Sequence, residues 1–371
     1  MRYDLASLPI QSLFPAVCRA TAALTRLDER IGWSPVGEGW ISRSHFADAA
    51  ASLWIDGELV HMEELVLHDA AMGVRAPTHE LAIAMDVLRS RRRIVSHPAG
   101  WAASAEGLRK LRGGEAAEQI PFETKGVSIY EKPDNEESAA EREGDRSWRE
   151  HLAAVDALLA RSEAVLAGNS RPDIRPRPRE RDPMIYEPDW DEDERLDAWR
   201  TVVGETTDLP PVLRAAVALD AWSHLQVFQH APWFGRLLAA DLLREAGLAG
   251  GHLPAFNLGL KQIERKHRAN RDRTARLLAT VEALIAAAET GLKENDRLLL
   301  ARQQMQHRIK GRRQSSKLPQ LVDLVLSRPL VTTGMIAETL SVTPQGALKL
   351  AAELNLRELT GRGRFRAWGI I

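Results

Sequence analysis

The sequence predicts a mainly α-helical fold. Apolar residues recur at helical spacing along most of the 371-residue chain, and strand-like alternation occurs only close to the C-terminus. Residues that favour helix ends stand at the borders of the apolar stripes: Thr78 precedes one stripe, and Gly247 follows another. The chain is long enough to bury a substantial core and to form two or three domains.

Composition excludes several classes of protein. Cys18 is the single cysteine, so an internal disulfide is excluded and a reducing, cytoplasmic location is expected. No apolar run approaches the roughly 18–20 residues of a membrane helix, and residues 1–14 lack the pattern of a signal peptide. A formal charge of -1 argues against a nucleic-acid partner, provided that the charge is spread evenly.

Residues 1–114 form the first predicted domain. The spacing of apolar residues predicts four helices in it, over residues 16–30, 44–53, 61–71 and 78–92. Four helix-breaking residues should form a turn-rich stretch between the first two helices: Gly32, Pro35, Gly37 and Gly39.

Three histidines of this domain invite a metal interpretation. His61 and His68 share a helix face but stand two turns, about 10 Å, apart, which is too far for one zinc ion. Together with His79 they are expected to be solvated or to cap helices, and no metal site is predicted.

The middle of the chain divides into a linker and a second helical region. Residues 115–194 are rich in charge and proline and are predicted to form a linker with one amphipathic helix over 148–166. Residues 195–310 contain the most apolar part of the chain. The predicted elements there are helices over 211–228 and 233–246, followed by a pair of long basic helices that ends near residue 309.

Residues 311–371 have a separate pattern. Helices are predicted over 318–328, 335–340 and 344–354, with a short extended piece over 329–333 before the second of them. Thr343 followed by Pro344 is a strong helix-start signal, because threonine caps an N-terminus and proline suits the first turn. Gly361 and Gly363 allow the tight turn of a terminal hairpin.

This order of elements is that of a winged helix-turn-helix, in which a recognition helix enters the major groove and a basic hairpin contacts the flanking backbone. Gln345 is best placed to read a base edge, and Gly346 permits a close approach to DNA. The candidate DNA-binding residues are Thr343, Gln345, Gly346, Lys349, Arg362, Arg364 and Arg366, of which the lysine and the arginines would contact phosphates.

The distribution of charge agrees with this interpretation. Residues 305–371 contain eleven basic and four acidic side chains, a surplus of seven positive charges, so the rest of the chain carries about -8. The near-zero total therefore combines an acidic body with a basic C-terminal module. An alternative is that the winged fold serves only packing or dimerisation and that its basic face is solvated.

Two segments of the body have motif-like spacing. One runs from His224 through His230, Pro232 and Gly235 to Arg236, and the other is Ser52-Leu-Trp-Ile-Asp56-Gly57. The first resembles the motif of the Fic family of nucleotidyl-transfer enzymes, and the second is similar to that family's inhibitory segment. The resemblance implies a Fic-like helical body, in which His230 and Arg236 would be the catalytic candidates.

The sequence departs from the Fic pattern where the chemistry resides. The segment after His230 is about five residues too short and contains neither the metal-binding carboxylate nor the Gly-Asn-Gly anion nest. Without these groups a histidine cannot position or neutralise a triphosphate. We therefore expect a degenerate body without enzymatic activity or cofactor, and the alternative for His230 is a capping or core role between two helices.

A second resemblance concerns the whole arrangement. Residues 42–50 and 75–80, together with the C-terminal module, resemble uncharacterised bacterial proteins, often plasmid-borne, that end in a helix-turn-helix. The leading hypothesis is a cytoplasmic DNA-binding protein, a transcriptional regulator or plasmid-associated factor, that binds double-stranded DNA as a homodimer. The alternatives are a nucleotidyl (AMP) transferase with a rearranged Fic-like site and a protein-only interaction or toxin–antitoxin component.

Overall fold

The computed structural model describes residues 3–6, 8–73, 76–112, 190–310, 316–360 and 366–370. Contacts group residues 1–114 and 191–371 into one compact unit. The helix predicted over 148–166 and the linkers on either side of it lie outside the described residues, apart from the last few positions before 195.

The N-terminal part is helical, as predicted. It consists of α1 (Ile10–Gly32), α2 (Gly37–Asp56), α3 (Met62–Asp69), α4 (His79–Ser96), the short 3₁₀ helix η1 (Trp101–Ala103) and α5 (Ala105–Arg112). The Thr78 hydroxyl accepts a 3.2 Å hydrogen bond from the Leu81 amide, so the predicted cap of α4 is confirmed.

The turn-rich stretch predicted between the first two helices is shorter than expected, because α2 already begins at Gly37. Gly37 and Gly39 lie inside the first turn of α2, because both are sites of close approach and not chain breaks. A Cβ at Gly37 would stand 2.5 Å from the Ile31 carbonyl oxygen, and one at Gly39 would stand 1.8 Å from that of Leu326. Only a residue without a side chain fits such contacts.

The central part contains α7 (Glu192–Glu205), α8 (Pro211–Leu225), α9 (Trp233–Glu245), α10 (Phe256–Lys261), α11 (Arg265–Arg268) and α12 (Arg273–Ile309). Gly247 has φ +75° directly after α9, which is the left-handed conformation expected of a helix stop. The predicted pair of long basic helices is wrong: two short helices precede one helix of 37 residues. Asp272 restarts the helix there by accepting hydrogen bonds from the Thr274 and Ala275 amides.

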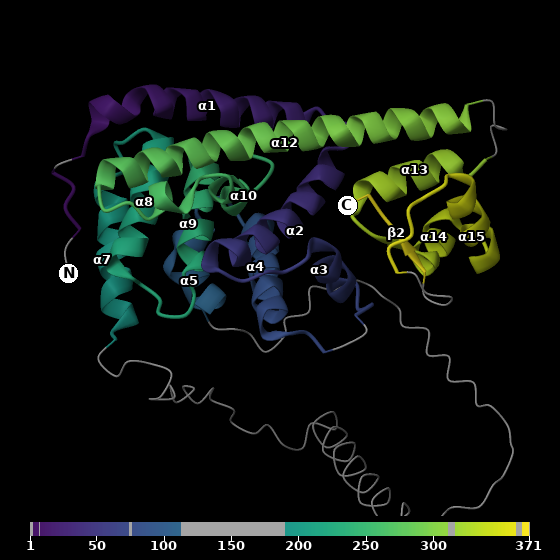
Figure 1. The fold of residues 1–371 in the computed structure, drawn as a ribbon, viewed down its shortest axis with the longest axis horizontal. Helices are drawn as coiled ribbons and strands as arrows, with labels where there is room; N and C mark the ends of the chain where they lie inside the picture. Colours follow the sequence, from purple (N-terminus) through teal and green to yellow (C-terminus); the bar gives the residue numbers. More distant parts are fainter. Residues whose placement is uncertain are drawn as a thin grey trace, which may run out of the picture. The chain divides into compact units, whose positions relative to one another are not determined.

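Two long helices define the frame of the body. α1 and α12 lie side by side (Figure 1) and are joined by an ion pair between Arg19 and Glu282. Trp40 of α2 donates a 2.9 Å hydrogen bond from Nε1 to the Gly291 carbonyl of α12, and this bond anchors α2 against the frame. None of the helices in the described ranges has both the length and the apolar character needed to span a membrane.

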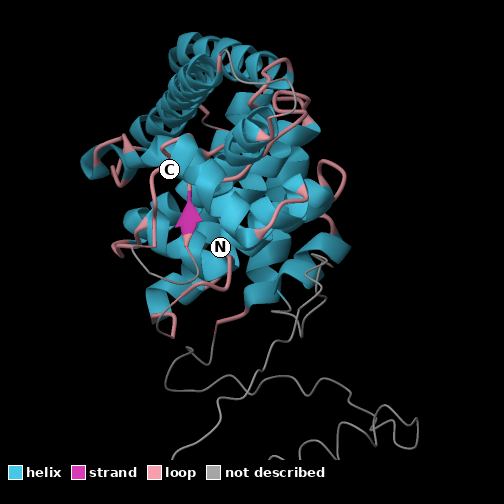
Figure 2. Cartoon of the chain, turned by 90° about the vertical axis from the view of Figure 1, so that its right-hand side faces the viewer, coloured by secondary structure: helices cyan, strands magenta, loops and turns pink. Residues whose placement is uncertain are grey.

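The C-terminal module contains α13 (Leu318–Ser327), β1 (Val331–Thr332), α14 (Thr333–Leu340), α15 (Pro344–Glu353) and β2 (Ala367–Trp368). β1 pairs antiparallel with β2, with Val331 opposite Trp368, and Figure 2 shows this small sheet in magenta among the helices. Glu358 forms a further antiparallel bridge with Trp368, which joins the two arms of the predicted hairpin. The chain is thus mainly helical and ends in a helix-turn-helix.

Candidate nucleic-acid interface

The turn between α14 and α15 is built by local hydrogen bonds. Ser341 ends α14 in the left-handed region with φ +51°, and the Val342 amide donates to the Ala337 carbonyl. The Thr343 hydroxyl then accepts a 3.1 Å hydrogen bond from the Gly346 amide, which begins α15. Pro344 occupies the first turn, where its missing N–H costs nothing.

α15 has one buried face and one exposed face. Ala347 and Ala351 are fully buried, and Leu354 at the helix end is buried with them. Gln345 and Lys349, which are one turn apart, are exposed. The helix therefore presents a polar and cationic face to solvent, next to the positive end of its own dipole.

Thr343 and Gly346 lie at the beginning of α15 beside that face. Thr343 is exposed and Gly346 is half-buried, and the two are joined by the cap. The four predicted recognition residues therefore occupy the first two turns of one helix and the residue before it.

The wing arginines divide into two groups. Arg362 and Arg364 lie outside the described residues. Arg366 pairs with Glu358 through bonds of 2.5 and 2.9 Å to the same carboxylate oxygen, and its guanidinium carbon lies 5.4 Å from the centre of the Trp368 ring. Its side chain is 40% exposed, so it remains within reach of an approaching phosphate while it fixes the base of the wing.

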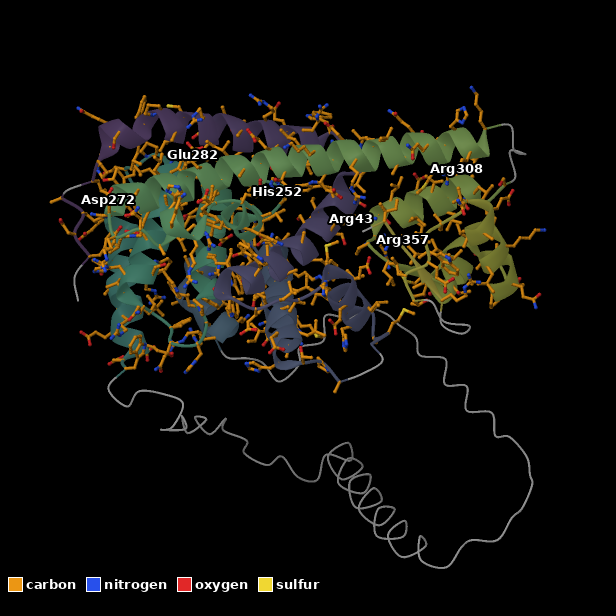
Figure 3. The ribbon with its side chains drawn as sticks, viewed as in Figure 1. Arg43, His252, Asp272, Glu282, Arg308 and Arg357 are labelled. Carbon is orange, nitrogen blue, oxygen red and sulfur yellow. The ribbon has the colours of Figure 1, made fainter. Side chains whose placement is uncertain are left out.

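Arginines join the module to the body, and Figure 3 labels three of them at that border: Arg43, Arg308 and Arg357. Arg308, in the last turn of α12, donates a 3.0 Å hydrogen bond to the Leu354 carbonyl at the end of α15. Arg357 forms a 3.2 Å ion pair with Glu63 of α3. The position of α15 is thus fixed by contacts from the body as well as by its own module.

Arg43 makes the most extensive of these contacts. Its five donors reach five backbone carbonyls: those of Gly39, Val325, Leu326, Arg328 and Ile370, at 2.7 to 3.0 Å. Three of these carbonyls lie at the C-terminal end of α13, where a helix leaves its carbonyls without internal partners. Burial lowers the pKa of Arg43 to about 10, so the side chain remains charged at neutral pH and supplies a cation where the helix dipole is negative.

The sequence patterns did not predict that Arg43 and Arg308 hold the C-terminal module. Arg43 stands one turn after Gly39 in a helix with many small residues, and a charged side chain at such a position signals buried pairing. Four of its five acceptors could not be inferred, because they come from residues hundreds of positions away.

The two segments with motif-like spacing, residues 224–236 and 52–57, meet in the body at Arg236. Arg236 of α9 pairs with the Asp56 carboxylate at 2.6 and 3.0 Å and donates a 3.0 Å hydrogen bond to the Ser52 hydroxyl. His230 is exposed in the loop between α8 and α9, so a core role for it is wrong. Across the ranges that the structure describes, no group of three or more histidine, cysteine or acidic side chains could hold a metal ion.

Comparison with known proteins identifies the module and the family. Residues 318–371 match an HTH DNA binding domain, and residues 184–310 match a protein family described as protein of unknown function (DUF1612). The chain is also similar to "Uncharacterized protein y4cF" of Sinorhizobium fredii (strain NBRC 101917 / NGR234), with 53% identity over 383 residues and complete coverage of both chains. The chain belongs to the family of y4cF.

In this y4cF family member the two matched regions meet between α12 and α13. The DUF1612 match ends at residue 310, directly after the last residue of α12, and the DNA binding domain begins at Leu318, the first residue of α13. The residues that hold the module, Arg43 and Arg308, therefore lie outside the matched DNA binding domain.

Proposed function

We propose that this protein binds double-stranded DNA through α15 and acts as a transcriptional regulator or plasmid-associated factor. The observation that carries this proposal is the match of residues 318–371 to an HTH DNA binding domain. The exposed pair on α15 supports it, since an amide such as Gln345 can bond an adenine edge and a cation such as Lys349 can bond a phosphate.

The proposed contacts follow from chemistry and position. Thr343 and Gly346 would lie at the groove edge, and Lys349 would contact a phosphate one turn later. Arg362, Arg364 and Arg366 would contact the backbone from the wing. Arg366 can contact a phosphate in two ways: the phosphate shares its guanidinium with Glu358, or the phosphate replaces the Glu358 carboxylate as its partner.

The test is DNA affinity as a function of salt. Fluorescence anisotropy with a fragment selected by genome-wide binding-site mapping should show a dissociation constant that rises steeply with salt. Lys349→Ala should weaken binding to all sequences and reduce the salt slope by about 1, whereas Gln345→Ala should reduce discrimination between sequences by about 1–3 kcal/mol. Lys293→Ala, an exposed lysine on α12, is the matched control and should bind as the wild type does. Absence of DNA binding at low salt would refute the proposal.

Organisation and assembly form a further part of this proposal. We assign residues 1–114 to an N-terminal helical domain, 115–194 to a charged linker with one helix, 195–310 to a degenerate Fic-like helical core with basic helices, and 311–371 to a winged helix-turn-helix DNA-binding domain. A homodimer would present two recognition helices to paired half-sites, which sedimentation of the free protein and of its DNA complex can test. A DNA-binding role agrees with the cytoplasmic location expected from the single cysteine.

A second candidate function is nucleotidyl transfer at a rearranged Fic-like site. The contact of Arg236 with Ser52 and Asp56 favours it, because two segments that resemble Fic motifs lie together. The same contact opposes activity, since it already engages the guanidinium that would bind phosphate. Incubation with labelled ATP and magnesium decides the matter: label that depends on His230 would support the transferase.

A further inference from the structure

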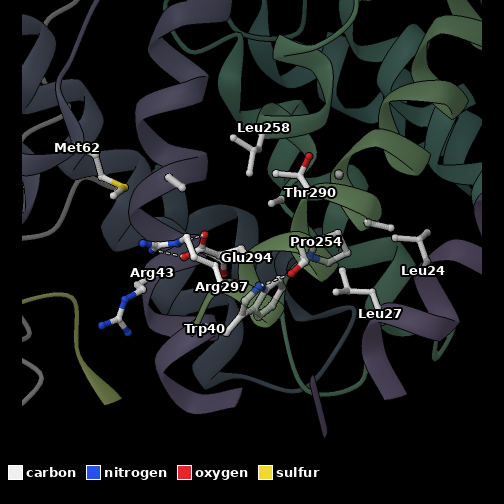
Figure 4. Close-up of a pocket in the computed structure, with 16 residues that line it drawn as sticks. Leu24, Leu27, Trp40, Arg43, Met62, Pro254, Leu258, Thr290, Glu294 and Arg297 are labelled. Carbon is white, nitrogen blue, oxygen red and sulfur yellow. Dashed lines mark hydrogen bonds and ion pairs between the residues drawn. The ribbon is translucent and has the colours of Figure 1, made fainter. Parts of the chain in front are cut away.

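A cavity of about 360 Å³ lies in the body between α1, α2, α10 and α12. Small-molecule sites in proteins begin at about 300 Å³ and are mostly apolar, with a few polar groups that orient the ligand. Figure 4 shows Leu24 and Leu27 on one side of this pocket and Met62 and Arg43 on the other.

The side chains that line the pocket differ in solvent exposure between its deep part and its rim. Leu24, Leu27 and Trp40 form the deep part, and each is at most 3% exposed. Met62 and Leu258 are half-buried at the rim, where solvent can reach them. The pocket can therefore accept an apolar chain or ring whose polar end stays near the rim.

The charged side chains that line the pocket favour an anion. They are Arg43, Glu294 and Arg297, which together carry one net positive charge. Arg297 bonds Glu294 through Nε at 2.7 Å and Nη2 at 2.6 Å, and for its Nη1 no partner occurs among the described residues. Its side chain is 43% exposed, so a carboxylate can approach it without breaking the ion pair.

One residue connects the pocket with the DNA-binding module. Arg43 lines the pocket and, through the same guanidinium, holds the carbonyls of Val325, Leu326 and Arg328 at the end of α13. Glu294 of α12 also lines the pocket, and its negative charge raises the pKa of Arg43 against the lowering that burial causes. A ligand that moves the Arg43 side chain therefore changes the support of the module.

We propose that this pocket binds a small amphipathic organic anion, an aliphatic or aromatic carboxylate, and that its occupancy changes DNA affinity through Arg43. The apolar depth would take the hydrocarbon part, and Arg297 would bind the carboxylate. The effect on DNA rests on the proposed DNA-binding function, whereas the binding of the anion does not.

Calorimetric titration of the full chain with decanoate tests the binding. Decanoate should bind with a submillimolar dissociation constant, and decyltrimethylammonium should bind at least fivefold more weakly. Ala47→Phe, which adds a ring to the pocket wall, should abolish decanoate binding, whereas Ala50→Phe, a half-buried alanine on α2 outside the pocket, should retain it. No binding to the wild type, or equal binding to a folded Ala47→Phe variant, would overturn the proposal.

Arg297→Gln provides a variant that should fold normally, because its side chain is partly exposed. It should weaken decanoate about three- to fivefold and leave decanol unchanged, since only the carboxylate loses a partner. An equal effect on both probes would show that Arg297 does not bind the carboxylate and would refute the anion assignment.

DNA anisotropy with and without saturating decanoate tests the coupling. The dissociation constant for DNA should change at least threefold in the wild type and less than 1.5-fold in Arg43→Lys, which retains the charge but has fewer donors. If DNA binds and decanoate binds but neither affects the other, the coupling is refuted while the proposed function stands. If DNA does not bind at all, the proposed function fails and the decanoate result is unaffected.

Discussion

Replacement of Arg43 by methionine should loosen the attachment of the C-terminal module to the body. Methionine keeps the length of the aliphatic part but has no donor, so all five carbonyls that Arg43 now bonds lose the hydrogen bond from its side chain. Three of them belong to the end of α13, and another is that of Ile370 next to β2. The variant therefore removes contacts on two elements of the module at once.

The expected size of this effect follows from burial. Arg43 is 3% exposed, so water cannot replace its hydrogen bonds unless the contact opens. An unsatisfied buried polar group costs about 1–3 kcal/mol, but methionine also avoids the cost of burying a cation. We expect a net loss of about 3–5 kcal/mol in the free energy of unfolding, which is large beside a usual total of about 5–15 kcal/mol.

Urea denaturation, monitored by tryptophan fluorescence, measures this loss, and hydrogen exchange of α13 amides locates it. Arg89→Met is the matched control, because the Arg89 side chain is 64% exposed and pairs with Asp86, one turn away on the same helix. The control should change stability by less than about 0.5 kcal/mol. A loss below about 1 kcal/mol for Arg43→Met, or unchanged exchange in α13, would refute the role assigned to this arginine.

Three further predictions concern single residues. Gly39→Ala places a Cβ 1.8 Å from the Leu326 carbonyl oxygen and should lower the unfolding free energy by about 1–3 kcal/mol in urea; an unchanged midpoint would contradict this close approach. Thr343→Ala removes the cap on the Gly346 amide and should cost about 1 kcal/mol in thermal unfolding, whereas Thr343→Ser should be nearly neutral. Burial and nearby cations lower the pKa of His45 well below 6.5, so the unfolded state binds more protons than the folded state just below pH 6.5. Stability should be complete above about pH 6.5 and fall by up to about 2 kcal/mol at pH 5, and His45→Phe should remove this dependence.

The C-terminal module could be predicted from the sequence because its signals are local. Thr343 bonds an amide three residues ahead, and Pro344 is fixed by its own ring, so both act within one helical turn. Thr332 caps α14 in the same way through the Met335 amide. A helix cap that depends only on neighbouring residues can be predicted without knowledge of the rest of the fold.

The connection between module and body could not be predicted, because its causes are distant in the chain. Gly39 was expected in a turn, yet it lies in a helix whose surface contacts the Leu326 carbonyl. Arg43 bonds that same carbonyl across 283 positions. Propensity favours a break at glycine, and tertiary contact overrides it here, as it does wherever a backbone must approach closely.

Some cationic side chains of the C-terminal region already bond other groups of the protein. The surplus of seven positive charges in residues 305–371 counts every cation equally. In the structure Arg308 bonds the end of α15 and Arg357 pairs with Glu63 of α3, whereas Arg366 pairs with Glu358, an acidic side chain that the surplus already subtracts. Arg308 and Arg357 hold the module against the body, so fewer of its cations are available to displace counterions than the surplus indicates. The salt slope of DNA binding should accordingly reflect fewer phosphates than the surplus of charge, since each contact contributes about 0.9 to that slope.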